Sequence, residues 1–248
     1  MKRELIKYLY SAYQSLLCNT KMYKLNWLLY RMSLRGIGVM NHQNPTVSGE
    51  KYFTEKLLSC IKKPTVFDVG ANVGNYTVLV RESSPEATIY AMEPHPQTYI
   101  LLKQCASKHN FTSLHTACGS KKGTLTLYDY KEDGGSTHAS AVEGVIQDLK
   151  QKEEVSVEVP VTTVDSLVGE NSIEQIDLLK IDTEGFEMEV LRGAKASITK
   201  GIIRCIQFEF NEMNVKSRTF ALDFVEALQD YRFFRMLPDG LVDLGVYY

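Results

Sequence analysis

The chain has 248 residues, of which 44% are hydrophobic and 23% are charged. This apolar content excludes an intrinsically disordered chain, and 16 glycines with 7 prolines exclude a collagen-like or low-complexity one. A formal net charge of −2 argues against a strongly basic nucleic-acid-binding protein, so no nucleic-acid partner is expected.

The charge is distributed unevenly along the chain. Residues 1–35 hold seven basic side chains against one acid, Glu4, so this segment carries +6 and the remainder carries −8. The asymmetry predicts an anionic partner for the basic segment: an anionic membrane surface, a lipid-phosphate-linked glycan, or the acidic body of the same or a neighbouring subunit. The alternative that the sequence favours is a pair of helices packed on the rest of the chain with a solvated basic face. A homo-oligomer is left open.

Nothing in the first residues predicts secretion. Glu4 and Lys7 interrupt the apolar core that a signal peptide needs, and no apolar run approaches the ~20 residues of a membrane span. The five cysteines are odd in number and form no C-x-x-C pair, as is typical of reduced thiols. We therefore expect a cytoplasmic protein, with peripheral attachment to the inner face of the membrane through residues 1–35 as an alternative.

Helical and loop signals occupy the N-terminal part of the chain. Apolar and aromatic residues at helical spacing predict one or two amphipathic helices within 1–34, and glycine, asparagine and proline mark a loop over 36–49. Ser48 is suited to cap a helix over 50–61. We expect a helical extension over 1–47 and one larger domain over 48–248.

From Pro64 onward, strand-like apolar runs alternate with helical segments. The expected strands cover 66–69, 88–93, 111–117, 123–130, 155–161, 176–182 and 202–210. One expected helix follows the glycine turn and ends near residue 83, and three others cover 96–109, 186–197 and 220–231. A hairpin is expected to turn at Pro238-Asp239-Gly240. This alternation predicts an α/β fold: a mostly parallel seven-stranded sheet with helices on both faces, closed by one antiparallel hairpin strand.

The strongest motif is FDVGANVGNYT at 67–77, in which a strand runs through a glycine turn into a helix. Gly70 and Gly74 let the backbone approach a ligand closely, and the spacing differs from the G-x-G-x-x-G of dinucleotide folds. Asp68 precedes the first glycine and suits a ligand with an ammonium group rather than a pyrophosphate. Asn72 and Asn75 contact this ligand or cap the helix.

A second acid completes a cofactor pattern. Glu93 ends the next expected strand, where a carboxylate can accept hydrogen bonds from both hydroxyls of a ribose, and Pro94 turns the chain. An adenosine with an amino-acid tail fits both acids, which predicts S-adenosylmethionine. The alternatives are a plain strand–helix turn, an NAD(P)-dependent oxidoreductase, against which the glycine spacing and Asp68 argue, and a non-catalytic S-adenosylmethionine-binding module.

Another acidic motif follows a buried strand, at IDLLKIDTEGFEME over 176–189. Asp182 lies at the carboxyl end of the strand, where ligands bind in this architecture, and Glu184 lies just beyond it. Lys180 shares a face with Asp182 and either neutralises it, the favoured interpretation, or acts as a base. Glu187 and Glu189 are expected on a solvated helix face.

Glu209 ends the strand expected over 202–210, so Asp182, Glu184 and Glu209 are expected to converge at one edge of the sheet. Three carboxylates could hold a divalent cation such as Mg²⁺. The favoured interpretation is that no metal binds and that they supply a base and acceptors for hydroxyl groups. His138 lies in a glycine-rich loop over 134–140 and is a lesser candidate for direct chemistry.

In combination, these motifs resemble the FkbM-type methyltransferases, a branch of the Rossmann-like S-adenosylmethionine-dependent class. The matching segments are FDVGANVGNYT at 67–77, YAMEPHP at 90–96, LHTACGSKKGTLTLY at 114–128, VPVTTVDSL at 159–167 and IDLLKIDTEGFEMEVLRGA at 176–194. The resemblance extends over about residues 48–240 and leaves 1–35 uncovered.

The resemblance implies O-methylation of a sugar or glycan hydroxyl, or of another small polar acceptor, with S-adenosylhomocysteine as product. By position it implies a cofactor site made of Asp68, Gly70, Ala71, Asn72, Gly74, Asn75, Tyr76, Glu93, Pro94, Ala117 and Asp182, with Ala117 near the adenine. Asp182 is the first candidate for the base, followed by Glu184, Glu209 and His138.

Overall fold

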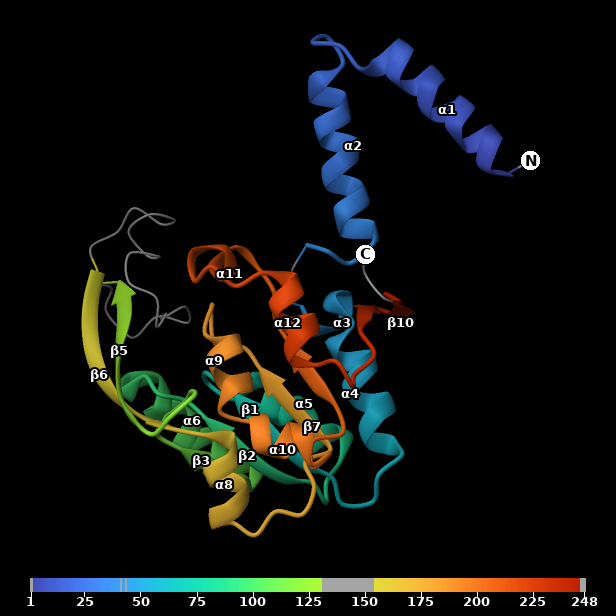
Figure 1. Ribbon diagram of the computed structural model, residues 1–248. Helices are drawn as coiled ribbons and strands as arrows, with labels where there is room; N and C mark the ends of the chain where they lie inside the picture. The colour runs from blue at the N-terminus through green and yellow to red at the C-terminus, as the bar shows by residue number, and fades with distance from the viewer. Residues whose placement is uncertain (1, 41, 43, 131–153, 246–248) are drawn as a thin grey trace. The chain divides into compact units, whose positions relative to one another are not determined.

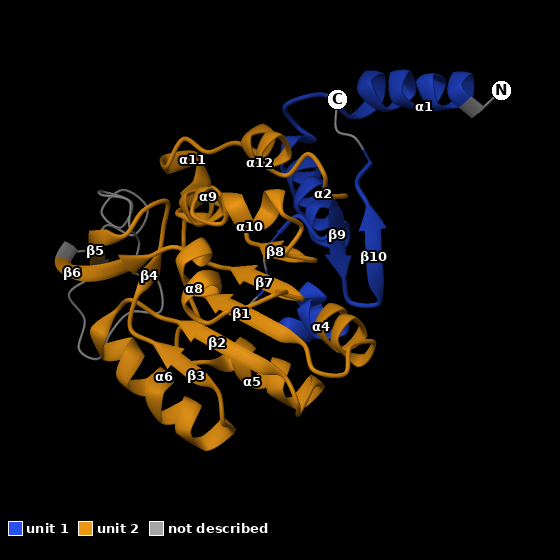
Figure 2. Ribbon diagram, turned by 60° about the horizontal axis from the view of Figure 1, so that its bottom comes forward, with its two compact units in different colours: residues 1–52, 233–248 blue, residues 53–232 orange. Residues whose placement is uncertain are grey.

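The computed structural model describes residues 2–40, 42, 44–130 and 154–245. The chain forms two compact units (Figure 2). The first unit contains residues 1–52 and 233–248, and the second contains residues 53–232. The C-terminal hairpin thus belongs with the N-terminal helices, and the division expected at 47/48 stays a prediction.

The first unit consists of helices and one hairpin. Its elements are α1 (Lys2–Leu17), α2 (Tyr23–Gly36), α3 (Pro45–Ser48), the start of α4 (Glu50–Ser59), and the antiparallel strands β9 (Phe234–Leu237) and β10 (Gly240–Asp243). The Asn26 side chain fixes the turn between α1 and α2, because it accepts a hydrogen bond from Tyr13 Oη at 2.5 Å and donates one to the Leu17 carbonyl at 2.8 Å. Within the described part of the chain, every helix is too short or too polar to cross a bilayer.

The second unit alternates strands and helices, as the sequence predicted (Figure 1). Its strands are β1 (Thr65–Val69), β2 (Thr88–Met92), β3 (Thr112–Leu114), β4 (Ala117–Cys118), β5 (Gly123–Tyr130), β6 (Glu154–Thr162), β7 (Leu178–Ile181) and β8 (Ile206–Phe208). Its helices are the remainder of α4, α5 (Asn75–Ser83), α6 (Pro96–His109), α8 (Val164–Glu170), α9 (Glu187–Arg192), α10 (Lys195–Thr199), α11 (Glu212–Lys216) and α12 (Ala221–Ala227).

The main sheet has the order β3-β2-β1-β7-β8, and all its pairings are parallel. Helices α5 and α6 lie on one face, and α8, α9 and α10 lie on the other (Figures 1 and 2). The order reverses at β1, so the chain leaves β1 toward one edge and later returns beside it as β7. The crevice beyond the ends of these two strands is where this architecture binds ligands. The predicted α/β class is confirmed.

The expected number of seven strands is wrong, because this sheet has five. The strand expected over 111–117 is interrupted after Leu114, and Ala117 pairs instead with Val161 of β6. Strands β4, β6 and β5 thereby form a separate three-stranded sheet, and the terminal hairpin forms a two-stranded sheet of its own. Apolar periodicity marks a strand but does not say which sheet it joins.

Other boundaries also differ from expectation. The strand expected over 202–210 is regular only in β8, with an isolated bridge at Ile203. The helix expected over 186–197 is divided into α9 and α10 at Gly193. There the Gly119 carbonyl oxygen lies only 2.0 Å from where a Cβ atom would be, so close packing of the backbone ends the helix.

A buried apolar row sets the strand register. Val66 of β1 lies between Ile89 of β2 and Leu178 of β7, and all three pack with Leu58 of α4 and Val80 of α5. These side chains are at most 2% exposed, and the row continues toward the strand ends with residues of the same face. The apolar row therefore fixes which side chains of β1 and β7 meet at the crevice.

Gly70→Ala tests the close contact at the end of β1. The added Cβ would lie 1.8 Å from the Asp182 carbonyl oxygen, in a residue with φ +80°. Gly201→Ala is the matched control, because Gly201 has φ +68° and open space around it. Backbone strain costs each variant about 1–2 kcal/mol. Gly70→Ala should lose roughly 1–3 kcal/mol more from the overlap. Urea denaturation measures both, and equal losses would contradict the contact.

Candidate functional site

A row of polar side chains crosses the main sheet one step beyond the apolar row. Asp68 of β1 lies opposite Lys180 of β7, which lies opposite Gln207 of β8. The three residues are 0%, 6% and 8% exposed. Buried polar groups of this kind must be paired, so their partners define the site.

The first turn of α5 satisfies part of this row. Thr77 Oγ1 donates to Asp68 Oδ2 at 2.6 Å, and Tyr76 Oη donates to Gln207 Oε1 at 2.7 Å. Tyr76 Oη also lies 3.1 Å from Thr54 Oγ1 in α4. Tyr76 is therefore held inside the unit by its own hydroxyl, and a direct contact between this residue and a cofactor stays a prediction.

Lys180 supplies the positive charge of the row. Its Nζ lies 3.0 Å from Asp182 Oδ2, 3.8 Å from Asp68 Oδ1 and 4.9 Å from the centre of the Tyr76 ring. An ammonium group between two carboxylates and over an aromatic face is a counter-ion. The structure thus favours the neutralising role of Lys180 over the role of a base.

One carboxylate oxygen of Asp68 is available to accept a hydrogen bond from a ligand. Burial raises the pKa of Asp68, and the nearby Lys180 and the Thr77 hydroxyl oppose that rise. Its Oδ1 atom accepts no hydrogen bond from the described residues, although it is fully buried. A buried carboxylate oxygen without a donor is costly, so it fits a ligand that brings an N–H group or a positive charge.

The glycine turn connects this row to the acidic motif. Gly70 and Gly74 have φ values of +80° and +94°. The Asp182 carbonyl packs where a Gly70 side chain would be, and side chains of α6 pack against Gly74. Contacts within the protein and the left-handed backbone thus favour glycine at both positions. The side chain of Asn72 or Asn75 was an alternative cap for α5, but its N-cap is Gly74 and no side chain caps it.

Glu93 holds the neighbouring turn together. Its two carboxylate oxygens accept hydrogen bonds from the Asn72 N–H at 2.9 Å and the His95 N–H at 2.8 Å. Burial raises its pKa to about 7, although both hydrogen bonds act in the opposite direction. Each oxygen retains a second lone pair, so Glu93 can still accept hydrogen bonds from ligand hydroxyls.

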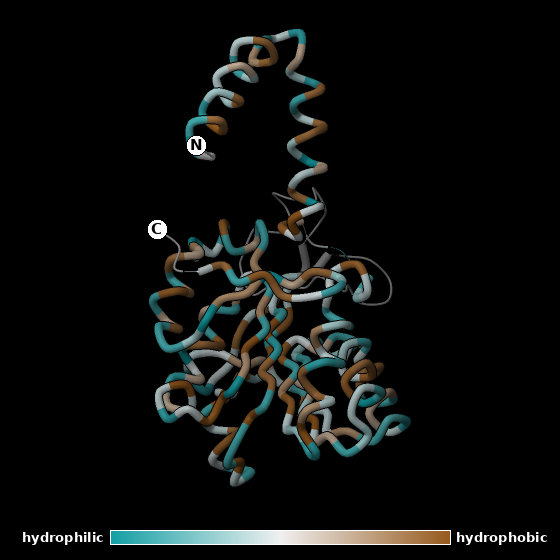
Figure 3. Tube along the Cα trace, turned by 90° about the vertical axis from the view of Figure 1, so that its right-hand side faces the viewer, coloured by the Kyte–Doolittle hydropathy of each residue, from teal (hydrophilic) through white to brown (hydrophobic). Residues whose placement is uncertain are grey.

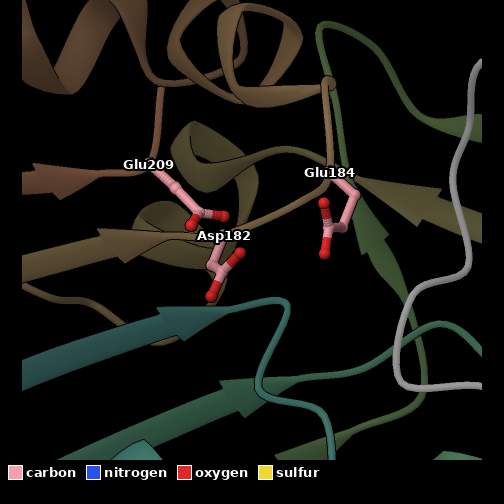
Figure 4. A group of neighbouring side chains, drawn as sticks. All are labelled: Asp182, Glu184 and Glu209. Atoms are coloured by element: carbon pink, nitrogen blue, oxygen red, sulfur yellow. The ribbon is translucent and has the colours of Figure 1, made fainter. Parts of the chain in front are cut away.

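The three acids predicted to converge do so (Figure 4). Asp182 follows β7, Glu184 lies two residues further in the same loop, and Glu209 follows β8. One carboxylate oxygen from each lies within 4.8 Å of the others. Burial raises the pKa of Glu209 to about 9, and repulsion from Asp182 and Glu184 contributes. Glu209 therefore holds a proton at neutral pH. The cluster could hold a divalent cation, but acidic clusters without metal are common.

Glu187 corrects one expectation. It was predicted on a solvated helix face, yet it is 1% exposed. Its carboxylate accepts hydrogen bonds from the Thr183 N–H at 2.9 Å, the Gly185 N–H at 3.1 Å and the Asn214 amide at 2.6 Å. These bonds fix the loop that carries Glu184, which has a left-handed φ of 52°. Glu187 is a positioning residue that the apolar pattern of α9 did not reveal.

The remaining candidates are less central. Pro94 lies beside the site, and its carbonyl is 3.0 Å from Nε2 of His115, which stacks on Tyr99. Ala117 is buried in β4 of the smaller sheet, not at the end of the third strand of the main sheet. His138 lies outside the described residues. Sequence reasoning also missed Thr77 and Gln207. Gln207 could have been found in the same way as Lys180, because each is a polar residue within an apolar strand.

A parallel sheet with a glycine turn after β1 and acids after β2, β7 and β8 is the arrangement of a Rossmann-like methyltransferase. The sequence profile described as "Methyltransferase FkbM domain" matches residues 68–235, more than half of the chain. The chain therefore belongs to the FkbM methyltransferase family, which confirms the resemblance.

Three curated proteins show the range of relatives. "Methyltransferase 1" of Beauveria bassiana is 28% identical over 52% of this chain and 57% of its own length. "Hexuronic acid methyltransferase AglP" of Haloferax volcanii is 26% identical over 52% of this chain and 48% of its own length. "2-O-methyltransferase NoeI" of Sinorhizobium fredii is 21% identical over 75% of this chain and 80% of its own length.

The chain spans about half the length of the first two of these relatives. Among solved structures, methyltransferase FkbM from Methylobacillus flagellatus matches with a TM-score of 0.45 at 14% identity, over 72% of this chain and 41% of that one. A likeness of this size says nothing about the substrate.

Glu187→Gln should loosen the acidic loop. The amide presents one oxygen where the carboxylate offers two, and its NH₂ group faces backbone N–H donors. We expect a loss of about 1.5–3 kcal/mol in the free energy of unfolding. Glu189→Gln is the matched control on the same helix. Glu189 forms an exposed pair with Arg192, so its loss should be below about 1 kcal/mol. Similar losses in urea denaturation would contradict the positioning role.

The raised pKa values predict how stability depends on pH. Glu209 has a folded-state pKa of about 9 against an ordinary value of 4.5. Between these two pH values, the folded chain holds the proton of Glu209 and the unfolded chain does not. The stability that Glu209 contributes is therefore greatest at the acid end of this window and is lost as pH rises toward 9. Glu209→Gln should flatten this fall throughout the window, whereas Glu93→Gln should flatten it only below about pH 7. Urea denaturation across this range measures both slopes, and an unchanged slope in Glu209→Gln would contradict the assignment.

Proposed function

We propose that this chain transfers a methyl group from S-adenosylmethionine to a hydroxyl of a sugar or glycan. The observation that carries the proposal is the group of acidic side chains at the ends of β1, β2, β7 and β8. It combines a buried carboxylate oxygen without a donor, a glycine turn, a ribose-type acid and three converging carboxylates. The family match argues against the nicotinamide alternative.

The residues present fit this cofactor. Asp68 Oδ1 could accept a hydrogen bond from the ammonium group of the amino-acid tail, and the free lone pairs of Glu93 could accept from ribose hydroxyls. When bound, S-adenosylmethionine supplies an electrophilic methyl group on a positively charged sulfur. Asp68, Asp182 and Glu184 outnumber the positive charge of Lys180 around the crevice, which favours a cation there.

The protein's own contribution to the chemistry is positioning and proton acceptance. An attacking hydroxyl must be held in line with the methyl group and must lose its proton as the new bond forms. Asp182 is the proposed acceptor, because Lys180 balances its charge while Glu209 holds a proton at neutral pH. The neutral Glu209 can then donate a hydrogen bond to the acceptor molecule or to Asp182, and Glu184 can accept from a second hydroxyl.

A sugar acceptor is supported by the relatives. AglP is named for a hexuronic acid, and NoeI is named for 2-O-methylation. A panel of oligosaccharides with and without hexuronic acid, assayed with labelled S-adenosylmethionine, tests the class of acceptor. Tight binding of S-adenosylhomocysteine without turnover on any glycan would favour the non-catalytic alternative. Binding of NADH without S-adenosylmethionine would overturn the proposal.

Asp182→Asn should abolish turnover and leave most of the cofactor affinity. Losing a positioned base lowers the rate by roughly 10²–10⁴-fold. Glu93→Gln is the contrasting variant, since it should weaken binding of S-adenosylhomocysteine more than it lowers turnover at saturating cofactor. Calorimetry and the methyl-transfer assay separate the two effects. Equal losses of binding and turnover in Asp182→Asn would contradict its role as base.

A further inference from the structure

The apolar side chains of α1 gather on one face of the helix. Leu5, Leu9 and Leu16 are separated by four and seven residues, and Ile6 and Tyr13 by seven, the spacings that align side chains along a helix. All five are exposed. Figure 3 shows apolar and polar residues alternating along this helix and along α2. An exposed apolar stripe of this length on a short helix points to a binding surface.

The basic side chains of α2 form a stripe of their own. Lys24, Arg31 and Arg35 are separated by seven and four residues and therefore share one face. Trp27 and Leu28 lie on either side of this stripe, each within three or four residues of both Lys24 and Arg31. Trp27 is 51% exposed and Leu28 is 55% exposed. Positive charges thus lie between a tryptophan and an aliphatic side chain on one surface.

We propose that α1 and α2 bind in the plane of an anionic lipid bilayer. The lipid phosphates would pair with Lys24, Arg31 and Arg35, while Trp27 and the leucine stripe of α1 would enter the boundary between headgroups and acyl chains. An anionic bilayer offers both negative charge and hydrocarbon on one surface, which is the combination that these helices present. The proposal does not depend on the methyl-transfer activity.

A second copy of the chain is the competing occupant of this surface. A second copy that paired through the same helices would cover the leucines, but it would bring a +6 segment against a +6 segment. Like charges at short range oppose such a contact, whereas anionic lipid attracts both segments. An acidic protein surface would match the charges but would leave the leucine stripe exposed to water. Charge and apolar area together therefore favour the bilayer.

Trp27 is the only tryptophan in the sequence, so its fluorescence reports on this surface directly. With the full chain, vesicles of phosphatidylcholine and phosphatidylglycerol should shift the emission to the blue, and brominated lipids should quench it. Vesicles of phosphatidylcholine alone should do so at least tenfold more weakly. Raising the salt concentration should weaken the binding. No shift, or equal shifts with both vesicles, would overturn the proposal.

Two variants and one control test whether the basic residues of α2 and the leucines of α1 bind the bilayer. Lys24→Glu/Arg31→Glu/Arg35→Glu and Leu5→Gln/Leu9→Gln/Leu16→Gln should each lower the apparent affinity at least tenfold in vesicle flotation. Lys103→Glu/Lys108→Glu/Lys121→Glu makes the same charge change at exposed lysines of the second unit and should leave flotation within twofold of the unaltered chain. Circular dichroism checks that each variant is folded.

The competing occupant gives a different result in the same measurements. If a second copy covers the surface, the Trp27 emission will shift to the blue with rising protein concentration in the absence of lipid. Analytical ultracentrifugation will then show a dimer that the leucine variant abolishes. That outcome, or loss of flotation in the Lys103/Lys108/Lys121 control, would overturn the bilayer as partner.

Discussion

The site depends on the side-by-side pairing of β1 and β7. This pairing places Asp68 opposite Lys180, and it brings the carbonyl of Asp182 against Gly70 so closely that no side chain fits between them. The turn after β1 and the acidic loop after β7 are more than a hundred residues apart in the sequence, yet each limits the conformation of the other. Since parallel strands end at one edge of the sheet, the pairing also sets where both loops meet a ligand.

Helix α5 completes this arrangement from one face of the sheet. Its first turn supplies the hydroxyls of Tyr76 and Thr77, which bond to Gln207 and Asp68 on two different strands. A helix tied to the strands in this way has a fixed N-terminus, and the glycine turn that precedes it is held at both ends. The buried polar row therefore acts as a positioning device, because hydrogen bonds in a low-dielectric interior are strong and hold the strands and α5 together, while Asp68 Oδ1 stays available to a ligand.

Sequence periodicity predicted the helices and strands better than it predicted which strands pair with one another. The bounds of α6 and β5 and the convergence of Asp182 and Glu209 followed from local apolar patterns and from the rule that ligands bind at strand ends. The transfer of Ala117 to a second sheet did not, because it depends on pairing with Val161, which local patterns do not encode. Glu187 was misplaced for a related reason. Its donors belong to the preceding loop and to Asn214, which the spacing of α9 does not show.

The balance of charge explains why the acids of the crevice behave differently from one another. Lys180 lies within 4 Å of Asp68 and Asp182 and partly offsets both, and Glu209 keeps a proton because Asp182 and Glu184 repel a further negative charge. A cation entering the crevice would offset the charges of Asp182 and Glu184 and lower the pKa of Glu209. Binding of a positively charged ligand should therefore tighten as pH rises toward the pKa of Glu209. A ligand without net positive charge would not produce that pH dependence, so the charge balance around Glu209 distinguishes a cationic ligand from a neutral one.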